Sequence, residues 1–259
     1  MKSVAIIPAR MGSSRFPGKP MKEIHGVPMI GHCYLRTKMC KDLFETYVAT
    51  CDKEIYDYIK SINGNVVMTS ASHEMACDRA SEAMIKIEKE INSKIDIIVM
   101  VQGDEPMVTP EMISESLKPF TEDPTVNIVN LMSEMETVKE FEDPNEVKVV
   151  VDTNSNAIYF SREAVPSQKK FSSEVPMLKQ VCVIPFRRQY LLNFNAMTRT
   201  SLEIIESIDM LRIIENGEKI RMVMTAVNSL SVDTPYDLDR VRKVMLNDPL
   251  IKKYTDAKL

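Results

Sequence analysis

The sequence predicts an α/β protein with a mainly parallel sheet flanked by helices. Short apolar, β-branched runs alternate with longer amphipathic segments through the first half of the chain. Several amphipathic segments begin with Pro, Asp or Glu, which favour the first turn of a helix. With 259 residues, the chain has room for one large domain that carries an inserted lobe. In such a sheet, ligands are expected beyond the carboxyl ends of the strands.

The first half of the chain supplies most of the predicted sheet. Its strands are predicted at Val4–Ile7, Tyr47–Thr50, Val66–Thr69, Ile97–Val101 and Asn127–Leu131. Its helices are predicted at Pro28–Leu43, Asp52–Ile62, Glu74–Glu90 and Pro110–Pro119.

From Asn145 the pattern changes to that of a β-hairpin. Glu146–Asp152 and Ala157–Phe160 flank the polar turn Thr153–Asn156. The elements predicted after the hairpin are a strand at Lys179–Phe186, a helical pair at about Ser201–Asn216, a strand at Ile220–Ala226 and a final helix from Pro235. We interpret residues 143–216 as an accessory lobe within a single domain that spans residues 1–259.

Composition favours a globular protein that acts on small molecules. The net charge of −4 argues against binding to nucleic acid, because phosphate backbones select basic surfaces. The five cysteines are scattered and odd in number, which is typical of reduced thiols in the cytoplasm. The N-terminus has the pattern of a strand rather than of a signal peptide, and no apolar run reaches the roughly 18 residues of a membrane span. We expect a cytoplasmic protein with no membrane partner.

The segment after the first predicted strand, residues 8–20 (PARMGSSRFPGKP), has the composition of a polyphosphate-binding loop. Gly and Ser let the backbone approach a ligand closely, and Arg10, Arg15 and Lys19 supply fixed cations that would neutralise a triphosphate and a departing pyrophosphate. The segment matches neither the dinucleotide fingerprint nor the P-loop, since Pro20 follows Lys19. By composition alone, a solvated surface loop whose Gly and Pro merely turn the chain is the favoured interpretation.

This segment resembles the signature of the sugar-activating cytidylyltransferases, especially the 3-deoxy-manno-octulosonate cytidylyltransferases. The similarity continues through VQGDEPM (101–107), DPNEVKVVVD (143–152), AIYFSR (157–162), the acidic run 203–212 and VDTPYDLDRVR (232–242). The resemblance implies a Rossmann-like nucleotidyltransferase fold of the GT-A type. It also implies transfer of CMP from CTP to a 2-keto-3-deoxy acid sugar for lipopolysaccharide, and a homodimer joined through the accessory lobe.

The resemblance assigns Asp104 and Asp233 as ligands of Mg²⁺, each near the end of a predicted strand. Without it, turn and helix-cap chemistry is the favoured interpretation of both aspartates. Glu105 is a further candidate beside the metal. His25 and His32 have no Cys, Asp or Glu at ligand spacing, so both are expected on a loop or helix surface. The residues assigned to CTP are Pro8, Ala9, Arg10, Gly12, Ser13, Ser14, Arg15, Lys19, His73, Arg79, Gln102 and Asp104.

The acceptor region departs from the family pattern. The residues assigned to the acceptor are Gln102, Arg162, Gln180, Glu206, Asp209 and Met210. Gln180 stands where the family usually has His, and Met210 stands where it has Gln. Ile184 and Pro185 replace Tyr and Gly, and Ala76, Cys77 and Asp78 replace Gly, Thr and Glu near the expected cytosine site.

These replacements leave two alternatives open beside 3-deoxy-manno-octulosonate as the acceptor. The acceptor could be a different acid, such as an amino-substituted octulosonate, a nonulosonate or a phosphonate, because a site built to bond one set of hydroxyls discriminates against others. The second alternative is a protein that binds the nucleotide without catalysis.

Overall fold

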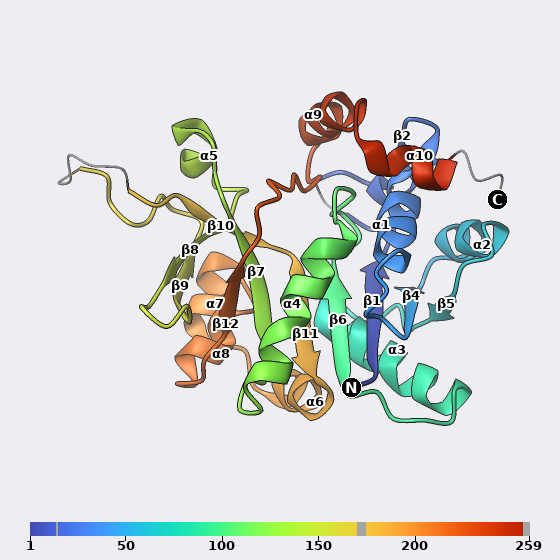
Figure 1. Ribbon diagram of the computed structural model, residues 1–259, viewed down its shortest axis with the longest axis horizontal. Helices are drawn as coiled ribbons and strands as arrows, with labels where there is room; N and C mark the ends of the chain where they lie inside the picture. Colours follow the sequence, from blue (N-terminus) through green and yellow to red (C-terminus); the bar gives the residue numbers. More distant parts are fainter. Residues whose placement is uncertain (14, 170–174, 256–259) are drawn as a thin grey trace. The chain divides into compact units, whose positions relative to one another are not determined.

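The computed structural model describes residues 1–13, 15–169 and 175–255 (Figure 1). The chain forms two compact units. The first unit comprises Met1–Ser114 and Ser229–Leu259, and the second comprises Glu115–Asn228. Helix α4 (Pro110–Glu122) carries the chain from the first unit into the second.

The first unit is built on parallel strands in the order β6-β1-β4-β5. The strands are β1 (Ser3–Ala9), β4 (Glu45–Thr50), β5 (Val66–Met68) and β6 (Ile97–Val101). Every residue of β1 and β6 is buried, which is why their sequences are continuous apolar runs. The structure confirms the predicted parallel sheet.

Helices connect these strands in two directions. The chain passes from β1 through α1 (Met29–Lys38) to β4, and through α2 (Lys53–Ser61) to β5. It then returns through α3 (Ala76–Glu90) to β6, on the other side of β1. Because parallel crossovers are right-handed, this reversal places helices on both faces of the sheet. The remaining elements of this unit are η1 (Lys19–Met21), β2 (Glu23–Ile24), β3 (Val27–Pro28), α9 (Pro235–Met245) and α10 (Pro249–Thr255).

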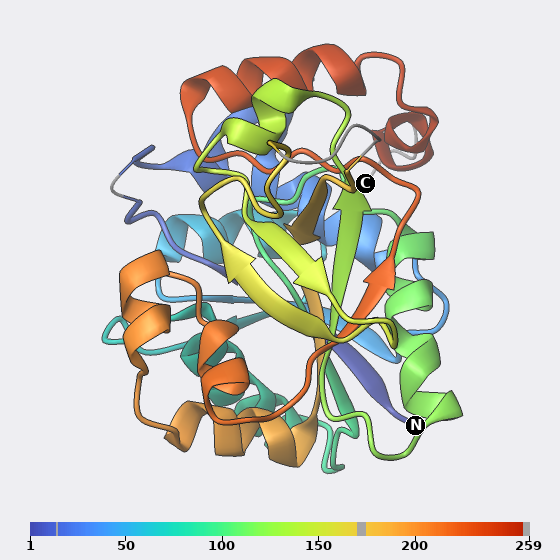
Figure 2. The same cartoon turned by 90° about the vertical axis from the view of Figure 1, so that its left-hand side faces the viewer.

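The second unit contains a mixed sheet in the order β12-β7-β10-β8-β9 (Figure 2). Its strands are β7 (Val129–Glu134), β8 (Lys148–Val151), β9 (Ala157–Ser161), β10 (Leu178–Val181) and β12 (Arg221–Met224). β12 runs parallel to β7, whereas β8 and β9 form the predicted antiparallel hairpin. Its other elements are α5 (Val138–Glu142), β11 (Val183–Arg187), α6 (Arg188–Ala196), α7 (Ser201–Glu206) and α8 (Leu211–Glu215).

The short elements η1, β2, β3 and α5 were not predicted from the sequence, and three longer segments also differ from the expectation. The single strand predicted at Lys179–Phe186 is two strands, β10 and β11, which are interrupted at Cys182. Helix α1 ends at Lys38 rather than at Leu43. Helix α6 was not predicted, although its buried side chains at Tyr190, Leu191 and Phe194 have helical spacing.

The expectation that His32 lies on the surface is wrong. His32 is fully buried, with Nε2 at 2.7 Å from the carbonyl oxygen of Ile24 and Nδ1 at 2.7 Å from the Tyr254 hydroxyl. Neither partner is a Cys, Asp or Glu, so a search for metal-ligand spacing did not find them. His25 is exposed, as expected.

None of the helices in the part of the chain that the structure describes is long and apolar enough to cross a membrane.

Candidate active site

The candidate active site in the first unit begins where β1 and β6 end. These strands are parallel neighbours, with Ile6 opposite Met100, so the segments that follow them leave the sheet at the same edge. Gly103 allows the two segments to approach closely, because a Cβ atom there would lie 2.9 Å from the carbonyl oxygen of Pro8. The loop after β1 and the Gln102–Asp104 segment are therefore in contact.

Lys19 joins two carboxylates that are far apart in the sequence. Its Nζ lies 2.7 Å from Oδ2 of Asp104 and 3.1 Å from Oδ1 of Asp233, and it also donates to the carbonyl oxygen of Val232 at 3.0 Å. The backbone N–H of Val232 donates to the carbonyl oxygen of Asp104 at 3.0 Å. All three charged side chains are mostly buried, with 14%, 19% and 19% of their surface exposed. The structure thus brings three predicted site residues to one point.

The ionisation of Lys19 follows from this arrangement. Burial lowers the pKa of Lys19, but the charges and hydrogen bonds of Asp104 and Asp233 act in the opposite direction and leave the pKa above its ordinary value. Lys19 is therefore an ammonium cation at neutral pH.

The other cations of the loop are more exposed. Arg15 forms an ion pair with Asp233, with Nη2 2.9 Å from Oδ1, and 47% of its side chain is exposed. Arg10 lies exposed directly after β1. Both guanidinium groups are accessible to a ligand that approaches from solvent.

The remaining loop residues assigned to CTP follow β1 in sequence. Pro8 and Ala9 are buried in the strand itself, and Gly12 is exposed. The Oγ atom of Ser13 accepts a hydrogen bond of 3.3 Å from the backbone N–H of Phe16. Ser14 lies outside the described residues.

The two aspartates suit a hard divalent cation. Their oxygens already converge on one positive group, the Lys19 ammonium, and a pair of carboxylates is typical of Mg²⁺ sites completed by substrate oxygens and water. Over residues 1–13, 15–169 and 175–255, no group of three or more His, Cys, Asp or Glu side chains is arranged to hold a metal. Asp104 and Asp233 are the two carboxylates that the resemblance assigned to a metal, and the structure brings both onto one ammonium group.

Glu105 links the two segments that carry these aspartates. It is almost fully buried, and its Oε2 accepts a hydrogen bond of 2.8 Å from the Ser229 hydroxyl. Ser229 lies shortly before Asp233 in the sequence. The sequence did not identify Ser229 or the Val232 carbonyl, because neither carries a recognisable chemical motif.

The segment expected to hold the cytosine is organised by buried charges. Arg79 is only 3% exposed, and its guanidinium donates to Oγ1 of Thr69 and to the carbonyl oxygens of Ser70 and His73. Arg79, which the resemblance assigned to CTP, therefore holds the backbone of residues 69–73 in place.

Glu82 completes this segment, and sequence reasoning missed it. It accepts from the backbone N–H of Ser70 at 2.9 Å and lies 2.5 Å from Nε2 of His73. Burial raises the pKa of Glu82, but the hydrogen bonds from Lys86, Ser70 and His73 outweigh it and lower the pKa to about 2. Glu82 stays ionised and keeps His73 oriented.

The residues assigned to the acceptor, apart from Gln102, lie in the second unit. Glu206 accepts hydrogen bonds from the Tyr159 and Ser161 hydroxyls and from the backbone N–H of Arg162. The Arg162 guanidinium donates to the backbone carbonyls of Glu206, Pro144 and Ser207. Arg162 therefore links the end of α7, at Glu206 and Ser207, to Pro144 in the loop before β8.

The last two assigned residues lie in the turn after α7. Asp209 is partly exposed, and Met210 is fully buried. The structure does not place the Met210 side chain where a ligand could reach it.

Gln180 is oriented by a buried amide that sequence reasoning missed. The Nδ2 atom of Asn130 donates to the carbonyl oxygens of Leu131 and Val181, each at 2.8 Å, so its Oδ1 faces Gln180. The Nε2 atom of Gln180 donates to this oxygen at 2.6 Å. The Oε1 atom of Gln180 is therefore the part of its amide that can accept from a ligand.

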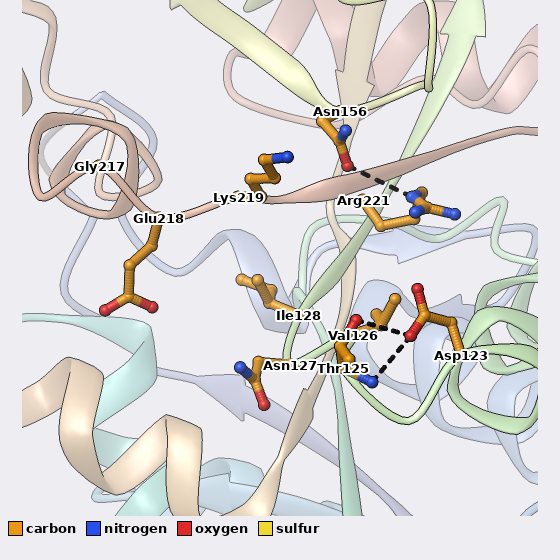
Figure 3. A pocket seen from close by; sticks show the side chains of 10 residues that line it. All are labelled: Asp123, Thr125, Val126, Asn127, Ile128, Asn156, Gly217, Glu218, Lys219 and Arg221. Carbon is orange, nitrogen blue, oxygen red and sulfur yellow. Dashed lines mark hydrogen bonds between the residues drawn. The ribbon is translucent and has the colours of Figure 1, made fainter.

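A separate cavity of about 340 Å³ lies in the second unit (Figure 3). It is lined by Asp123, Thr125, Val126, Asn127, Ile128, Asn156, Gly217, Glu218, Lys219 and Arg221. Two carboxylates balance its two cations, and the Asp123 carboxylate is bonded to the N–H and hydroxyl of Thr125. None of the predicted site residues lines this cavity.

Known proteins resemble this chain over nearly its whole length. The cytidylyltransferase family model matches residues 4–220. The 3-deoxy-manno-octulosonate cytidylyltransferase of Geobacter metallireducens is 41% identical over 251 residues, which cover 93% of this chain and 96% of that protein. The enzyme of the same name from Trichlorobacter lovleyi is 40% identical, over 95% of this chain and 99% of that protein.

A solved structure agrees with these matches. The structure of CMP:2-keto-3-deoxy-manno-octonic acid synthetase complexed with CTP superposes with a TM-score of 0.85 at 36% identity, and the match covers 95% of this chain and 98% of that one. The sequence matches, the shared fold and the clustering of Lys19, Asp104 and Asp233 are mutually consistent. This chain belongs to the 3-deoxy-manno-octulosonate cytidylyltransferase family of cytidylyltransferases.

Proposed function

We propose that this chain transfers CMP from CTP to 3-deoxy-manno-octulosonate and releases pyrophosphate. The observation that carries the proposal is the convergence of Asp104 and Asp233 on the ammonium of Lys19, beside the loop that follows β1. The arrangement combines a cationic loop for a triphosphate with two carboxylates for a divalent cation. The names of the relatives that share nearly the whole chain make 3-deoxy-manno-octulosonate the acceptor to test first.

The reaction joins the acceptor to the α-phosphorus of CTP. The acceptor hydroxyl oxygen forms a bond to this phosphorus, the bond to the bridging oxygen of the β-phosphate breaks, and the hydroxyl proton is released to solvent. Arg10, Arg15 and Lys19 would bind the triphosphate and neutralise the charge that develops on the departing pyrophosphate. These three roles follow from the charge and placement of the side chains.

Asp104 and Asp233 would hold Mg²⁺ in this reaction. When bound, the ion supplies Lewis-acid polarisation of the phosphate and lowers the pKa of a hydroxyl bound to it. Asp104 would contribute its carboxylate from the segment after β6, and Asp233 from the segment just before α9.

Measurement of pyrophosphate release tests the proposal. Wild-type protein with CTP, Mg²⁺ and 3-deoxy-manno-octulosonate is expected to release pyrophosphate and form the CMP-sugar. Asp104→Asn and Asp233→Asn are each expected to lower the rate by at least about 10³-fold, because loss of a charged group at the reacting phosphate typically has such effects. Rates near that of the wild type in either variant would exclude a metal role for that residue.

A panel of acids separates the acceptor from the reaction type. An amino-substituted octulosonate, a nonulosonate and a phosphonate serve as competitors in the same assay. A higher kcat/KM with one of these acids than with 3-deoxy-manno-octulosonate would identify that acid as the acceptor. The reaction would still be a cytidylyl transfer. CTP binding without turnover on any acceptor would instead favour the non-catalytic alternative.

We also propose that the protein acts in the cytoplasm as a homodimer, with residues 143–216 serving as the acceptor-binding and dimerisation lobe. The support is the resemblance to the family, and the lobe falls within the compact unit Glu115–Asn228. Sedimentation analysis at several protein concentrations tests the dimer. A single species of 29.5 kDa, the mass of one chain, would exclude it.

A further inference from the structure

Asp52 contacts the loop that follows β1. β1 and β4 are parallel neighbours with Ala9 opposite Thr50, so the chain leaves both strands at the same edge of the sheet. Asp52 lies just past the end of β4, and its Oδ2 accepts a hydrogen bond of 2.8 Å from the backbone N–H of Met11. This bond ties the start of the cationic loop to the sheet.

Met11 is the residue on which the loop closes. Its carbonyl oxygen accepts hydrogen bonds from the backbone N–H groups of Ser13 and Gly18, each at 3.0 Å. Gly18 has a φ of 71°, in the left-handed region, and it directly precedes η1, which begins with Lys19. The position of Met11 therefore influences both ends of the segment that carries Arg15 and Lys19.

The side chain of Asp52 is directed away from its own helix. Asp52 is the N-cap residue of α2, where a carboxylate usually accepts from the first free N–H groups of the helix. Here its side chain makes no such cap. The Cys51 thiol donates to the same oxygen at 3.6 Å, and the backbone N–H of Asp52 donates to Oγ1 of Thr50 at 3.1 Å. These contacts hold Asp52 toward Met11.

We propose that Asp52 is a positioning residue for the triphosphate loop: its carboxylate oxygen holds Met11, and Met11 sets the loop conformation that presents Arg15 and Lys19. The inference rests on the proposed function, in which this loop binds CTP. The role of the Asp52 side chain requires only that it accept the hydrogen bond from Met11. Its negative charge is not required, because a negative charge near a triphosphate is repulsive. Asparagine supplies the same acceptor without the charge.

Three variants test this role. Asp52→Ala removes the acceptor, and Asp52→Asn retains it. Asp57→Ala is the matched control, because Asp57 lies on the same helix, is exposed and pairs only at the surface with Lys53. For each protein, calorimetry gives the affinity for CTP, steady-state assays give both KM values, and NMR hydrogen exchange follows the amides of Met11, Ser13 and Gly18.

Asp52→Ala is expected to weaken CTP binding and raise the KM for CTP by about tenfold, the typical effect of losing one hydrogen bond. The KM for the acceptor and the exchange of the α2 amides should stay at wild-type values, while the three loop amides exchange faster. Asp52→Asn should match the wild type, or bind CTP slightly more tightly.

Two results would overturn the proposal. In the first, Asp52→Ala equals Asp57→Ala in CTP affinity and in exchange of the loop amides. In the second, Asp52→Asn is as impaired as Asp52→Ala, which would mean that the charge or the fold matters rather than the acceptor. Failure of the proposed function is visible separately as absence of pyrophosphate release by the wild type. In that case CTP affinity and loop exchange still decide the role of Asp52.

Discussion

Lys19 lies between two carboxylates that repel each other when no cation separates them. Its ammonium lies between Asp104 and Asp233, at 2.7 and 3.1 Å from their oxygens. Two partly buried carboxylates that contact the same ammonium group would repel each other without it. Lys19 therefore keeps the pair together in the absence of nucleotide.

The Lys19→Met variant is expected to bind Mg²⁺ more tightly than the wild type when no nucleotide is present, because the ion then replaces the missing ammonium. The measurement is the shift of the melting temperature between EDTA and excess Mg²⁺. An ion present at 100 times its dissociation constant stabilises a protein by about 2.7 kcal/mol, which such a shift reports readily.

The matched control for this prediction is Lys22→Met. Lys22 is exposed and lies near the same loop, 5.9 Å from the Phe16 ring centroid. Its variant should show the wild-type response to Mg²⁺. If Mg²⁺ raised the melting temperature equally in both variants, the proposal that the Lys19 ammonium occupies the place of the ion would be wrong.

Helix α1 holds the C-terminal helix α10 through a buried histidine. Because Nε2 of His32 faces the Ile24 carbonyl, it carries the proton, and Nδ1 accepts from the Tyr254 hydroxyl. Burial is the main cause that lowers the pKa of His32 from 6.5 to about 4. The histidine is thus neutral in the folded chain at physiological pH.

The free energy of unfolding should fall as the pH decreases from about 6.5 to about 4. In that window the unfolded chain binds a proton at His32 that the folded chain does not, so acid favours unfolding, whereas above the window this contribution is constant. The expected contribution is about 3 kcal/mol at full extent. Urea unfolding of the wild type and of His32→Gln at a series of pH values measures it.

The stability difference between the wild type and His32→Gln should narrow toward low pH. His25→Asn serves as the control, since His25 is exposed and its positive φ of 50° suits Asn. If the difference in unfolding free energy between the wild type and His32→Gln stays constant from neutral pH down to about 4, the pKa of His32 is not lowered by the fold.

The first turn of α9 fixes the backbone at Asp233. Oδ2 of Asp237 accepts from the N–H groups of Asp233 and Thr234, at 3.1 and 2.8 Å, and Oγ1 of Thr234 accepts from the N–H of Asp237. This is a capping box, which defines where the helix begins and hence where Asp233 lies.

Asp237→Ala is expected to lower kcat by about tenfold and stability by about 1 kcal/mol, because loss of the cap loosens Asp233 without removing its carboxylate. Asp239→Ala on the same helix is the control, since Asp239 is exposed and pairs with Arg242 at the surface. The assay is pyrophosphate release together with thermal unfolding. Equal kcat values in Asp237→Ala and Asp239→Ala would show that the capping box does not affect catalysis.

Across the whole molecule, the sequence predicted elements better than it predicted contacts. β1 and β6 were recognisable because strands that are buried on both faces are continuous apolar runs. The break at Cys182 carries no Gly or Pro of its own, so β10 and β11 looked like one strand. Helix α6 was missed, although its apolar spacing was present in the sequence.

In the candidate site, too, the sequence predicted which charged residues are present better than it predicted their contacts. Lys19, Asp104 and Asp233 were identified by type and family pattern, and the structure brings them together. Arg79 and Arg162 were assigned to ligands by the family pattern, but the sequence did not predict that both guanidinium groups donate to backbone carbonyls. A sequence shows that a cation is present, but the group it faces depends on residues that only the folded chain brings near.

The two compact units predict separable effects on the two substrates. Arg15 belongs to the first unit with the cationic loop, whereas Gln180 belongs to the second, as do all the residues assigned to the acceptor except Gln102. Arg15→Gln should raise the KM for CTP about tenfold with the KM for 3-deoxy-manno-octulosonate unchanged, because a charged contact to phosphate is lost.

Gln180→Ala is expected to affect the KM for the acceptor and not the KM for CTP. It removes the Oε1 atom that the Asn130 amide orients, so the KM for the acceptor should rise about tenfold while the KM for CTP stays at the wild-type value. Gln189→Ala is the control, since Gln189 is exposed and bonds only to its helix neighbour Asn193 among the contacts described. If Gln180→Ala changes the KM for CTP as much as the KM for the acceptor, the division of substrates between the two units is wrong.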